Sequence, residues 1–281
     1  MKRLVTMQDL SCLGKCSLSV AHPVLSAMGI GCTMLPTAVL STHTAFPGPV
    51  VRDLGDFARP AMDHWQSIGA GFDGILTGYL ATPAQGALAL ELAERFGENA
   101  LIVHDPAMGD HGRLYSGMGP EMVEAHRQVC AGADLVIPNL TEGAWLAGLP
   151  YQDRADLDLC QQIATALLKT SAKAVLLTGY APSPDRVGFY YTDGTTEFAH
   201  AAPKIPRSCH GTGDLFAAVT MGGLLNGLSV PESGKLAAEF VHRAIANTGT
   251  DSRFGVEFES ELGWLARQGR VPLRSDNPAD K

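Results

Sequence analysis

Short apolar runs alternate with longer segments of helical periodicity over the first two thirds of the chain. The runs are rich in Val, Ile and Leu, which suits strands buried on both faces of a sheet. The predicted strands are 3–7, 32–39, 74–77, 101–104, 135–137 and 174–178. The predicted helices are 19–28, 56–68, 83–96, 120–130, 142–147 and 156–169. Strand–helix alternation predicts an α/β protein with a mostly parallel central sheet and helices on both faces.

The pattern changes after residue 178. Segments 187–192 and 195–200 flank Asp193-Gly194, a dipeptide typical of a type I′ hairpin turn. Two further helices are predicted over 214–225 and 231–246, followed by a polar tail from about residue 269. Since no internal repeat, low-complexity tract or linker is visible, we expect a single domain over residues 1–281.

Composition narrows the class of protein. Hydrophobic residues make up 46% of the chain and charged residues 18%, which indicates a globular protein. The net charge of −8 argues against nucleic acid as a partner, but not against ATP, which is held by local N–H groups and metal. The N-terminus becomes charged too early for a signal peptide, and no apolar stretch is long enough to span a bilayer. We therefore expect a cytoplasmic protein with no membrane partner.

The most informative run follows the predicted hairpin. His210-Gly211-Thr212-Gly213-Asp214 stands directly before an apolar stretch that reads as the start of a buried helix. Two glycines allow a tight turn, and a helix start directs unpaired N–H groups and the positive end of the macrodipole at one point. An anion is stabilised there, and the Asp214 carboxylate could take a proton from an attacking hydroxyl. The run favours phosphoryl transfer to an alcohol, with a simple helix-capping loop as the alternative.

Polar residues also follow three consecutive predicted strands. Asp105, Asn139 with Glu142, and Thr178 each stand where a strand ends. Ligands collect at the carboxyl ends of parallel strands, and oxygen ligands suit Mg²⁺. The alternative is structural, because Asp-Pro is a common turn and Asn139 with Glu142 could form a helix capping box.

Other candidate motifs are weaker. Gly14-Lys15 resembles the end of a Walker A loop, but Asp9 stands at the upstream glycine position and Cys16 at the Ser/Thr position. No G-x-G-x-x-G follows an early strand, so a dinucleotide-binding fold is unsupported. His43 and His104 could be acid–base groups, although lone histidines are more often structural.

Taken in order, these residues resemble the ribokinase superfamily, and within it the pyridoxal/pyridoxamine kinase branch. The resemblance runs from about residue 4 to about residue 247. Its motifs are Gly-Thr-Gly-Asp at 211–214, Asn-x-x-Glu at 139–142, Asp-Pro-x-Met-Gly-Asp at 105–110, Thr77-Gly78-Tyr79 and His43-Thr44. It implies a three-layer ribokinase-like sandwich and ATP-dependent phosphorylation of the 5′-hydroxymethyl group of pyridoxal, pyridoxamine or pyridoxine, in the salvage of pyridoxal 5′-phosphate.

The resemblance also implies roles for single residues. Asp214 would accept the substrate hydroxyl proton. The anion hole for the transferred phosphoryl group would be Gly211, Thr212 and Gly213. The residues around Mg²⁺, its water and ATP would be Asp105, Asp110, Tyr115, Asn139, Glu142 and Thr178, of which Asp105 and Glu142 would hold the metal. The pyridine pocket would be lined by Asp9, His43, Thr44 and Tyr79. Residues 110–122, rich in glycine, would form a mobile flap over the phosphates, and a homodimer would be usual for the family.

Two positions depart from the family pattern. Familiar pyridoxal kinases carry Ser where this chain has Asp9, and an Asp there resembles hydroxymethylpyrimidine kinases of thiamine synthesis. Ile137 replaces a Thr implicated in monovalent-cation binding in some relatives, so a potassium requirement is left open. Hydroxymethylpyrimidine kinase is therefore the alternative enzyme, followed by a sugar or nucleoside kinase. The alternative from another class is a catalytically silent B6-binding regulatory protein, which the intact Asp214 disfavours.

Overall fold

The computed structural model describes residues 1–170 and 172–268. Within these residues, nine strands form one sheet in the order β11-β10-β9-β8-β5-β4-β1-β2-β3. The strands are β1 (Arg3–Leu13), β2 (Gly31–Thr42), β3 (Val51–Asp53), β4 (Gly74–Thr77), β5 (Leu101–His104), β8 (Leu135–Val136), β9 (Val175–Tyr180), β10 (Arg186–Thr192) and β11 (Glu197–Pro203). The six central strands are parallel, whereas β10, β11 and β3 pair antiparallel. The predicted mostly parallel sheet is confirmed.

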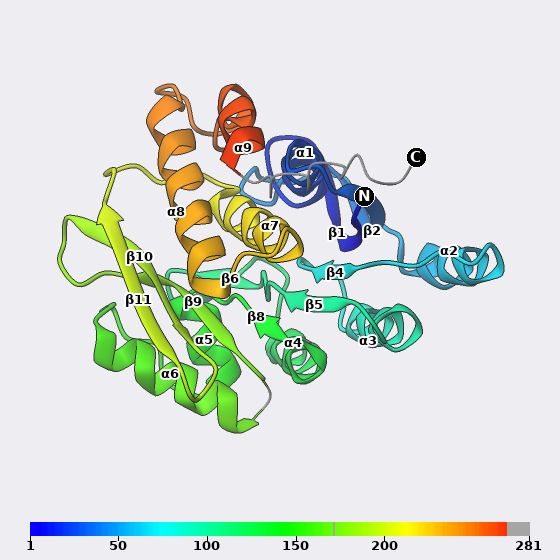
Figure 1. Cartoon of the computed structure of the whole chain (residues 1–281), viewed down its shortest axis with the longest axis horizontal. Helices are drawn as coiled ribbons and strands as arrows, with labels where there is room; N and C mark the ends of the chain where they lie inside the picture. Colours follow the sequence, from blue (N-terminus) through cyan, green and yellow to red (C-terminus); the bar gives the residue numbers. More distant parts are fainter. Residues whose placement is uncertain (171, 269–281) are drawn as a thin grey trace, which may run out of the picture.

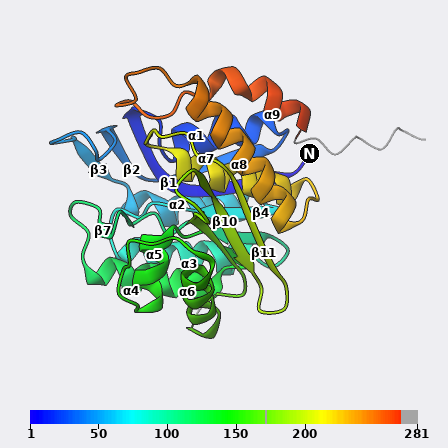
Figure 2. The same ribbon diagram turned by 90° about the vertical axis from the view of Figure 1, so that its left-hand side faces the viewer.

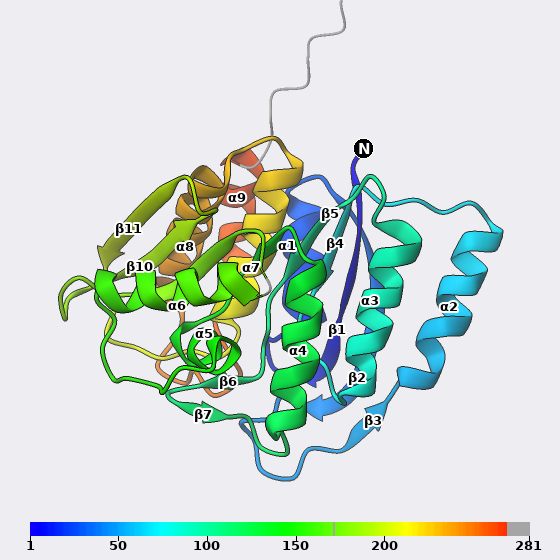
Figure 3. The same ribbon diagram turned by 90° about the horizontal axis from the view of Figure 1, so that it is seen from below.

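Helices cover both faces of this sheet, which gives three layers (Figure 1). One face carries α1 (Leu18–Ala27), α7 (Thr212–Leu225), α8 (Val230–Asn247) and α9 (Leu262–Gln268), the last preceded by the short turn η1 (Glu259–Glu261). The other face carries α2 (Gly55–Ser67), α3 (Ala84–Phe96), α4 (Pro120–Gly132), α5 (Leu140–Ala147) and α6 (Leu157–Thr170). Figure 3 shows α2, α3 and α4 side by side across that second face.

The apolar strand runs explain this layering. In β1, Leu4 packs into the cluster under α1, α7 and α8, and the next residue, Val5, packs into the cluster over α2 and α3. In β9, Leu176 and Leu177 divide between the two faces in the same way. Because successive side chains of a strand point to opposite faces, a strand buried on both sides needs an apolar residue at every position.

The predicted β10–β11 hairpin forms and leans against α8 (Figure 2). Its predicted type I′ turn at Asp193-Gly194 is wrong. Strand pairing ends at Thr192–Glu197, so four residues form the loop, and of these only Gly194 has a positive φ, of 86°. The Asp193 side chain accepts hydrogen bonds from the N–H groups of Thr195 and Thr196 at 2.9 and 2.7 Å, which stabilises the wider turn.

Other boundaries also differ from the predictions. β1 continues to Leu13, well beyond the predicted residue 7, and α7 begins at Thr212 and not at Asp214. Five elements were not predicted: the edge strand β3, the antiparallel pair β6 (Gly109–Asp110) and β7 (Arg113–Leu114), and η1 with α9. The predicted polar tail from about residue 269 lies outside the described residues. Among the helices that are described, none is both long and apolar enough to cross a membrane.

Candidate active site

An open cavity of about 500 Å³ lies at the carboxyl ends of the parallel strands, facing the start of α7. Every site residue predicted from the sequence lines it. These residues are Asp9, His43, Thr44, Tyr79, Asp105, Asp110, Tyr115, Asn139, Glu142, Thr178, Gly211, Thr212, Gly213 and Asp214. They come from loops and strand ends that are far apart in the sequence, and the sheet brings them together because parallel strands end at the same edge.

The same cavity is lined by residues that sequence reasoning missed. The polar ones among them are Ser11, Cys16, Ser17, His111, Ser116, Ser208 and His210. A signal for Ser17 was present, because a serine directly before an apolar helical run is typical of a helix start. The poor match of Gly14-Lys15 to a Walker A loop gives no reason to expect a site in this segment. His210 directly precedes the glycine run, but a lone histidine there predicts no particular role.

The start of α7 has the geometry that the glycine run predicts, with one difference. Gly211 is the N-cap residue with φ of 83°, and a Cβ atom there would lie 2.0 Å from the Lys15 carbonyl oxygen. Glycine is therefore required at 211 both by conformation and by space. Gly213 lies within the first helical turn, where a Cβ would meet nothing within 4 Å. Gly213 does not serve the turn but leaves the backbone open toward the cavity.

Asp214 is the third residue of α7 and its side chain faces this open space. Burial raises the pKa of its carboxyl group to about 6, and the nearby charge of Asp9 acts in the same direction. Hydrogen bonding to Ser17 opposes this shift. A helix N-terminus by itself favours the ionised carboxylate and would make Asp214 a weaker base, but the cost of burying the charge outweighs that effect. A carboxylate with a pKa near 6 is well suited to accept a proton at neutral pH.

Asp105 and Glu142 are two further carboxyl groups that line the cavity. Burial raises the pKa of Asp105 well above its usual range, and the charge of Asp214 adds to this. Burial also raises the pKa of Glu142, with Asp105 as the second cause. Among the described residues, no hydrogen bond to the Asp105 carboxylate is found. An unpaired carboxylate in a cavity is available to a cation, so the donor chemistry fits Mg²⁺.

The Asn139–Glu142 pair is the capping box that was left open as the structural alternative. The Asn139 side chain accepts from the Glu142 N–H at 2.9 Å, and a Glu142 carboxylate oxygen accepts from the Asn139 N–H at 2.8 Å. The other Glu142 oxygen accepts from the Met108 N–H at 3.2 Å. Glu142 is thus occupied by backbone donors on both oxygens, and Asp105 is the freer carboxylate.

Asp9 lies within β1, opposite a break in the pairing with β2 between Gln8 and Leu10. The extra residue lies on β2, where Thr37 and Ala38 stand opposite Asp9, and bulges are frequent beside active sites. The Asp9 carboxylate is buried and accepts a hydrogen bond from the Ser11 hydroxyl at 3.0 Å. Burial raises its pKa, while hydrogen bonds to Ser17 and Ser11 lower it.

The two histidines singled out in the sequence have different positions. His43 Nε2 lies 2.8 Å from the Arg253 carbonyl oxygen, and its Nδ1 accepts from the Ala45 N–H at 3.3 Å. Both nitrogens are thus occupied, so His43 presents its ring to the cavity. His104 is fully buried behind the cavity, bonded to Thr77 Oγ1 at 2.7 Å and to His126 at 3.0 Å. The structural alternative is confirmed for His104.

The predicted flap contains the β6–β7 pair. The Gly112 N–H donates to the Thr141 hydroxyl at 2.9 Å, and the Tyr115 N–H donates to the Met108 carbonyl at 2.9 Å. His111, at the tip, has a positive φ of 50°. These bonds tie the segment to the start of α5 and place Tyr115 near the carboxyl groups of the cavity. Burial is the largest cause that raises the pKa of the Tyr115 hydroxyl, and the charges of these carboxyl groups are the next.

Comparison with known proteins adds a family to this geometry. Residues 67–256 match the family described as Phosphomethylpyrimidine kinase. The chain is 33% identical over 268 residues to a pyridoxine/pyridoxal/pyridoxamine kinase of Bordetella pertussis, covering 87% of this chain and 89% of that one.

Solved structures agree in fold over almost the whole chain. Pyridoxal kinase of Lactobacillus plantarum superposes with a TM-score of 0.87 at 34% identity, covering 95% of this chain and 98% of that one. Pyridoxal kinase of Staphylococcus aureus, in complex with AMP-PCP and pyridoxal, superposes with a TM-score of 0.78 at 25% identity, covering 94% of each chain. The fold is thus ribokinase-like, and the chain belongs to the phosphomethylpyrimidine kinase family, among relatives that are pyridoxal kinases.

Proposed function

We propose that this protein transfers the γ-phosphoryl group of ATP to the 5′-hydroxymethyl group of a vitamin B6 vitamer. The observation that carries the proposal is Asp214, a carboxylate with a pKa near 6 at the start of α7, beside the open backbone of Gly213. Family membership and the pyridoxal kinases among the relatives support the same reaction. The product would be the 5′-phosphate of the vitamer, formed together with ADP.

In this mechanism the substrate hydroxyl oxygen attacks the γ-phosphorus, and the bond between that phosphorus and the ADP oxygen breaks. Asp214 accepts the proton of the attacking hydroxyl. The N–H groups at the start of α7, over Gly211, Thr212 and Gly213, stabilise the transferred phosphoryl group. Phosphoryl transfer passes through a loose transition state, so positioning and charge stabilisation supply most of the catalysis. A base with a pKa near 6 is sufficient, because the hydroxyl proton leaves late.

The vitamer would lie on the β1 side of the cavity, and the nucleotide would lie toward β9. Asp9, His43, Thr44 and Tyr79 are the proposed contacts of the pyridine ring. Asp110, Tyr115 and Thr178 are the proposed contacts of ATP. Asn139 holds the start of α5 in place between them, and its side-chain amide donates to the Gly109 carbonyl at 2.8 Å.

Mg²⁺ is part of the proposal. Asp105 would hold the ion directly, and Glu142, whose oxygens already accept backbone N–H groups, would act through bound water. When bound, Mg²⁺ would neutralise phosphate charge on ATP. Magnesium keeps several water and phosphate ligands, so a single free carboxylate is an adequate protein contribution. Ile137 supplies no oxygen ligand from its side chain, so we propose no monovalent-cation requirement at that position.

Hydroxymethylpyrimidine phosphorylation is the second candidate, and two observations favour it. The matching family is described as Phosphomethylpyrimidine kinase, and a carboxylate, Asp9, lines the ring pocket where a serine is familiar in pyridoxal kinases. A pyrimidine amine could donate a hydrogen bond to Asp9 as well as a vitamer amine could.

A side-by-side kinase assay tests the proposal. Purified protein with MgATP would be given pyridoxal, pyridoxamine, pyridoxine and hydroxymethylpyrimidine, and ADP and the phosphorylated product would both be measured. We expect the highest kcat/KM with a B6 vitamer. A higher value with hydroxymethylpyrimidine would favour the second candidate, and no ATP consumption with any of the four would favour a silent binding protein.

Three further features of the proposal rest on the sequence, and of these only the homodimer comes from the resemblance to the family. We propose one domain for residues 1–281, action in the cytoplasm and assembly as a homodimer. Sedimentation equilibrium of the purified chain would measure the oligomeric state directly.

A further inference from the structure

Ser17 has an unusual backbone conformation for its residue type. Its φ and ψ are 50° and −123°, a region that glycine adopts readily and that costs an L-residue strain. Within residues 1–170 and 172–268, only Ser17 and His111 are non-glycine residues with positive φ. Both line the cavity. Strain of this kind persists only where the surrounding structure enforces it, and it is concentrated at functional sites.

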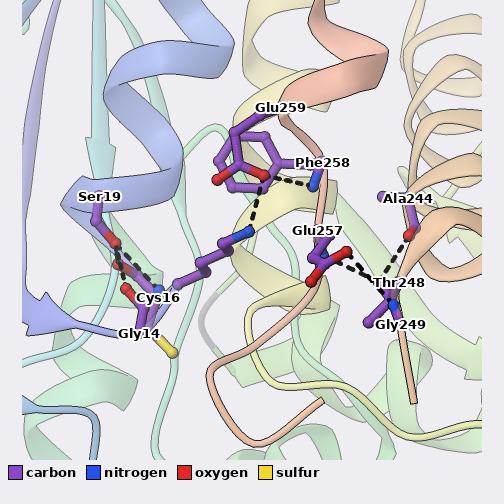
Figure 4. A network of polar contacts seen from close by, with 10 residues as sticks. Gly14, Cys16, Ser19, Ala244, Thr248, Gly249, Glu257, Phe258 and Glu259 are labelled. Carbon is purple, nitrogen blue, oxygen red and sulfur yellow. Dashed lines mark hydrogen bonds and ion pairs between the residues drawn. The ribbon is translucent and has the colours of Figure 1, made fainter. Parts of the chain in front are cut away.

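The Ser17 hydroxyl does not make the helix-capping hydrogen bond that is usual for a serine at this position. Ser17 is the N-cap residue of α1, a position that favours serine because the hydroxyl accepts a hydrogen bond from the first helical turn. In α1 no such side-chain bond is made. The neighbouring Ser19 stabilises the turn instead, donating to the Cys16 carbonyl at 2.7 Å and accepting from the Cys16 N–H at 3.2 Å (Figure 4).

The segment that carries Ser17 is held rigidly from the other side. Lys15 forms an ion pair with Glu259 at 2.8 Å, and its N–H donates to the Phe254 carbonyl at 2.9 Å. Figure 4 shows Glu259 and Phe258 facing the segment of Gly14 and Cys16. The Lys15 carbonyl meets Gly211 at the start of α7. The position of Ser17 is therefore set relative to α7, with little freedom to relax its backbone.

In this position Ser17 meets two carboxyl groups of the cavity. Its backbone and hydroxyl interact with Asp214, and its hydroxyl interacts with Asp9. The other ionisable groups whose charges interact with Asp214 are Asp105 from the end of β5, Cys16 from the same segment and Tyr115 from the flap. None of these is a cation. The groups that lower the pKa of Asp214 by hydrogen bonding are the backbone and hydroxyl of Ser17 and the backbone N–H of Asp214 itself, so Ser17 is the neighbouring residue placed to orient this carboxylate.

We propose that Ser17 is a positioning residue for phosphoryl transfer, with its strained backbone and a hydroxyl that does not cap α1 holding the Asp214 carboxylate against the attacking alcohol. The strain has a use in this arrangement, because the left-handed conformation turns Ser17 toward α7 at the point where α1 begins. The inference rests on the proposed role of Asp214 and deepens it, since it assigns what orients the base.

A double-mutant cycle between Ser17 and Asp214 tests this inference. Ser17→Ala removes the hydroxyl and keeps the backbone N–H, and we expect kcat to fall about tenfold, the effect of one hydrogen bond to a charged group, with KM changed by less than about twofold. Ser17→Gly removes the same hydroxyl and suits the positive φ, so it guards against a folding defect and should show the same loss. In an Asp214→Ala background there is no carboxylate to hold, and adding Ser17→Ala should change the residual single-turnover rate by less than about twofold.

Ser19→Ala is the matched control, because it removes a hydroxyl from the same helix start without touching Asp214. Any rate loss it causes should be equal in both backgrounds. A Ser17→Ala effect that is equally large with and without Asp214 would overturn the inference and leave Ser17 as a structural residue. If Asp214→Ala alone kept near-normal turnover, the proposed base would be wrong. A tenfold loss in Ser17→Ala would then act through another group and would overturn the inference as well.

Discussion

Helices α5 and α8 begin with the same hydrogen-bonded device in two different surroundings. At α8, the Ser229 N–H donates to Glu232 at 2.9 Å, and the Ser229 hydroxyl accepts from the Glu232 N–H at 3.4 Å. At α5, Asn139 and Glu142 make the equivalent reciprocal pair. Glu232 is exposed, whereas Glu142 is only 3% exposed and lines the cavity.

The surroundings reverse the direction of the pKa shift. Hydrogen bonding to Ser229 lowers the pKa of Glu232, whereas burial and the charge of Asp105 raise the pKa of Glu142. Burial is also the largest cause that raises the pKa of three further carboxyl groups lining the cavity, those of Asp9, Asp105 and Asp214. The same local motif thus stabilises a helix at the surface and, at α5, places a buried acidic group among other carboxyl groups in the cavity. Cations and proton donors are attracted to such a site.

Among the acidic residues of the cavity, replacing Asp214 should have the largest effect on turnover. Replacing it with asparagine removes the proposed base from the cavity while keeping nearly the same shape, and turnover should fall about 10²–10⁴-fold, with substrate and ATP affinity retained. Wild-type kcat/KM should fall as the pH drops below about 6, because Asp214 takes up the proton that it must lack as a base. Steady-state kinetics of both proteins from pH 5 to pH 9 measure this. Near-normal turnover in the variant would remove Asp214 from the role of base.

Asp9, another buried carboxyl group of the cavity, should affect the choice of substrate. Its buried carboxylate should favour pyridoxamine, whose aminomethyl group is cationic, over pyridoxal by roughly ten- to a hundredfold, the range for a charge-assisted hydrogen bond. Asp9→Ser should reduce this preference and leave the affinity for ATP unchanged. The ratio of kcat/KM for the two vitamers in each protein is the measurement. If the ratio is the same in both, Asp9 has a structural role in β1.

A direct test of the two capping boxes replaces the glutamate of each one with glutamine. Glu142→Gln should raise the Mg²⁺ concentration needed for half-maximal rate by about tenfold, the effect typical of residues that act on a metal through its surroundings. Glu232→Gln removes the equivalent charge at the surface and is the matched control, so its Mg²⁺ dependence should be that of the wild type. Rate measurements over a Mg²⁺ titration compare the two. Equal titrations for both variants would make Glu142 a helix cap only.

The smallest expected effect concerns residues 110–122. Hydrogen bonds hold the two ends of the β6–β7 region at Gly109 and Tyr115, and the Gly112 N–H in its turn donates to Thr141, while Asp110 and His111 beside that turn are exposed. We expect amide hydrogen exchange at the tip to slow when ATP is added, by a factor that exceeds any change in the surface turn of the β10–β11 hairpin. Equal exchange with and without nucleotide would identify the segment as a static loop.

The sequence predicted the buried apolar strands of the sheet well and missed the short strands that have no apolar pattern. β4 and β5 match their predicted bounds, because an uninterrupted apolar run is required wherever both faces of a strand are buried. β3 is exposed along its whole length, and β6–β7 has only two residues in each strand, so neither carries an apolar pattern. The end of β1 was missed for a related reason, since polar residues at 8, 9 and 11 interrupt the run, and Asp9 and Ser11 among them line the cavity.

By itself, the sequence determined which side chains could do chemistry here, through glycines that allow a helix to start at an anion and polar residues that follow apolar strands. Tertiary structure decided the burial, the charge state and the partners of each of these side chains. It buried Glu142 and exposed Glu232, raised the pKa of Asp214 where the helix dipole alone would have lowered it, and assigned His104 to the interior. It also brought Ser17 to Asp214 across 197 positions of the chain. Burial and long-range contacts set the charge state and partner of a side chain, and neither can be read from its neighbours in sequence.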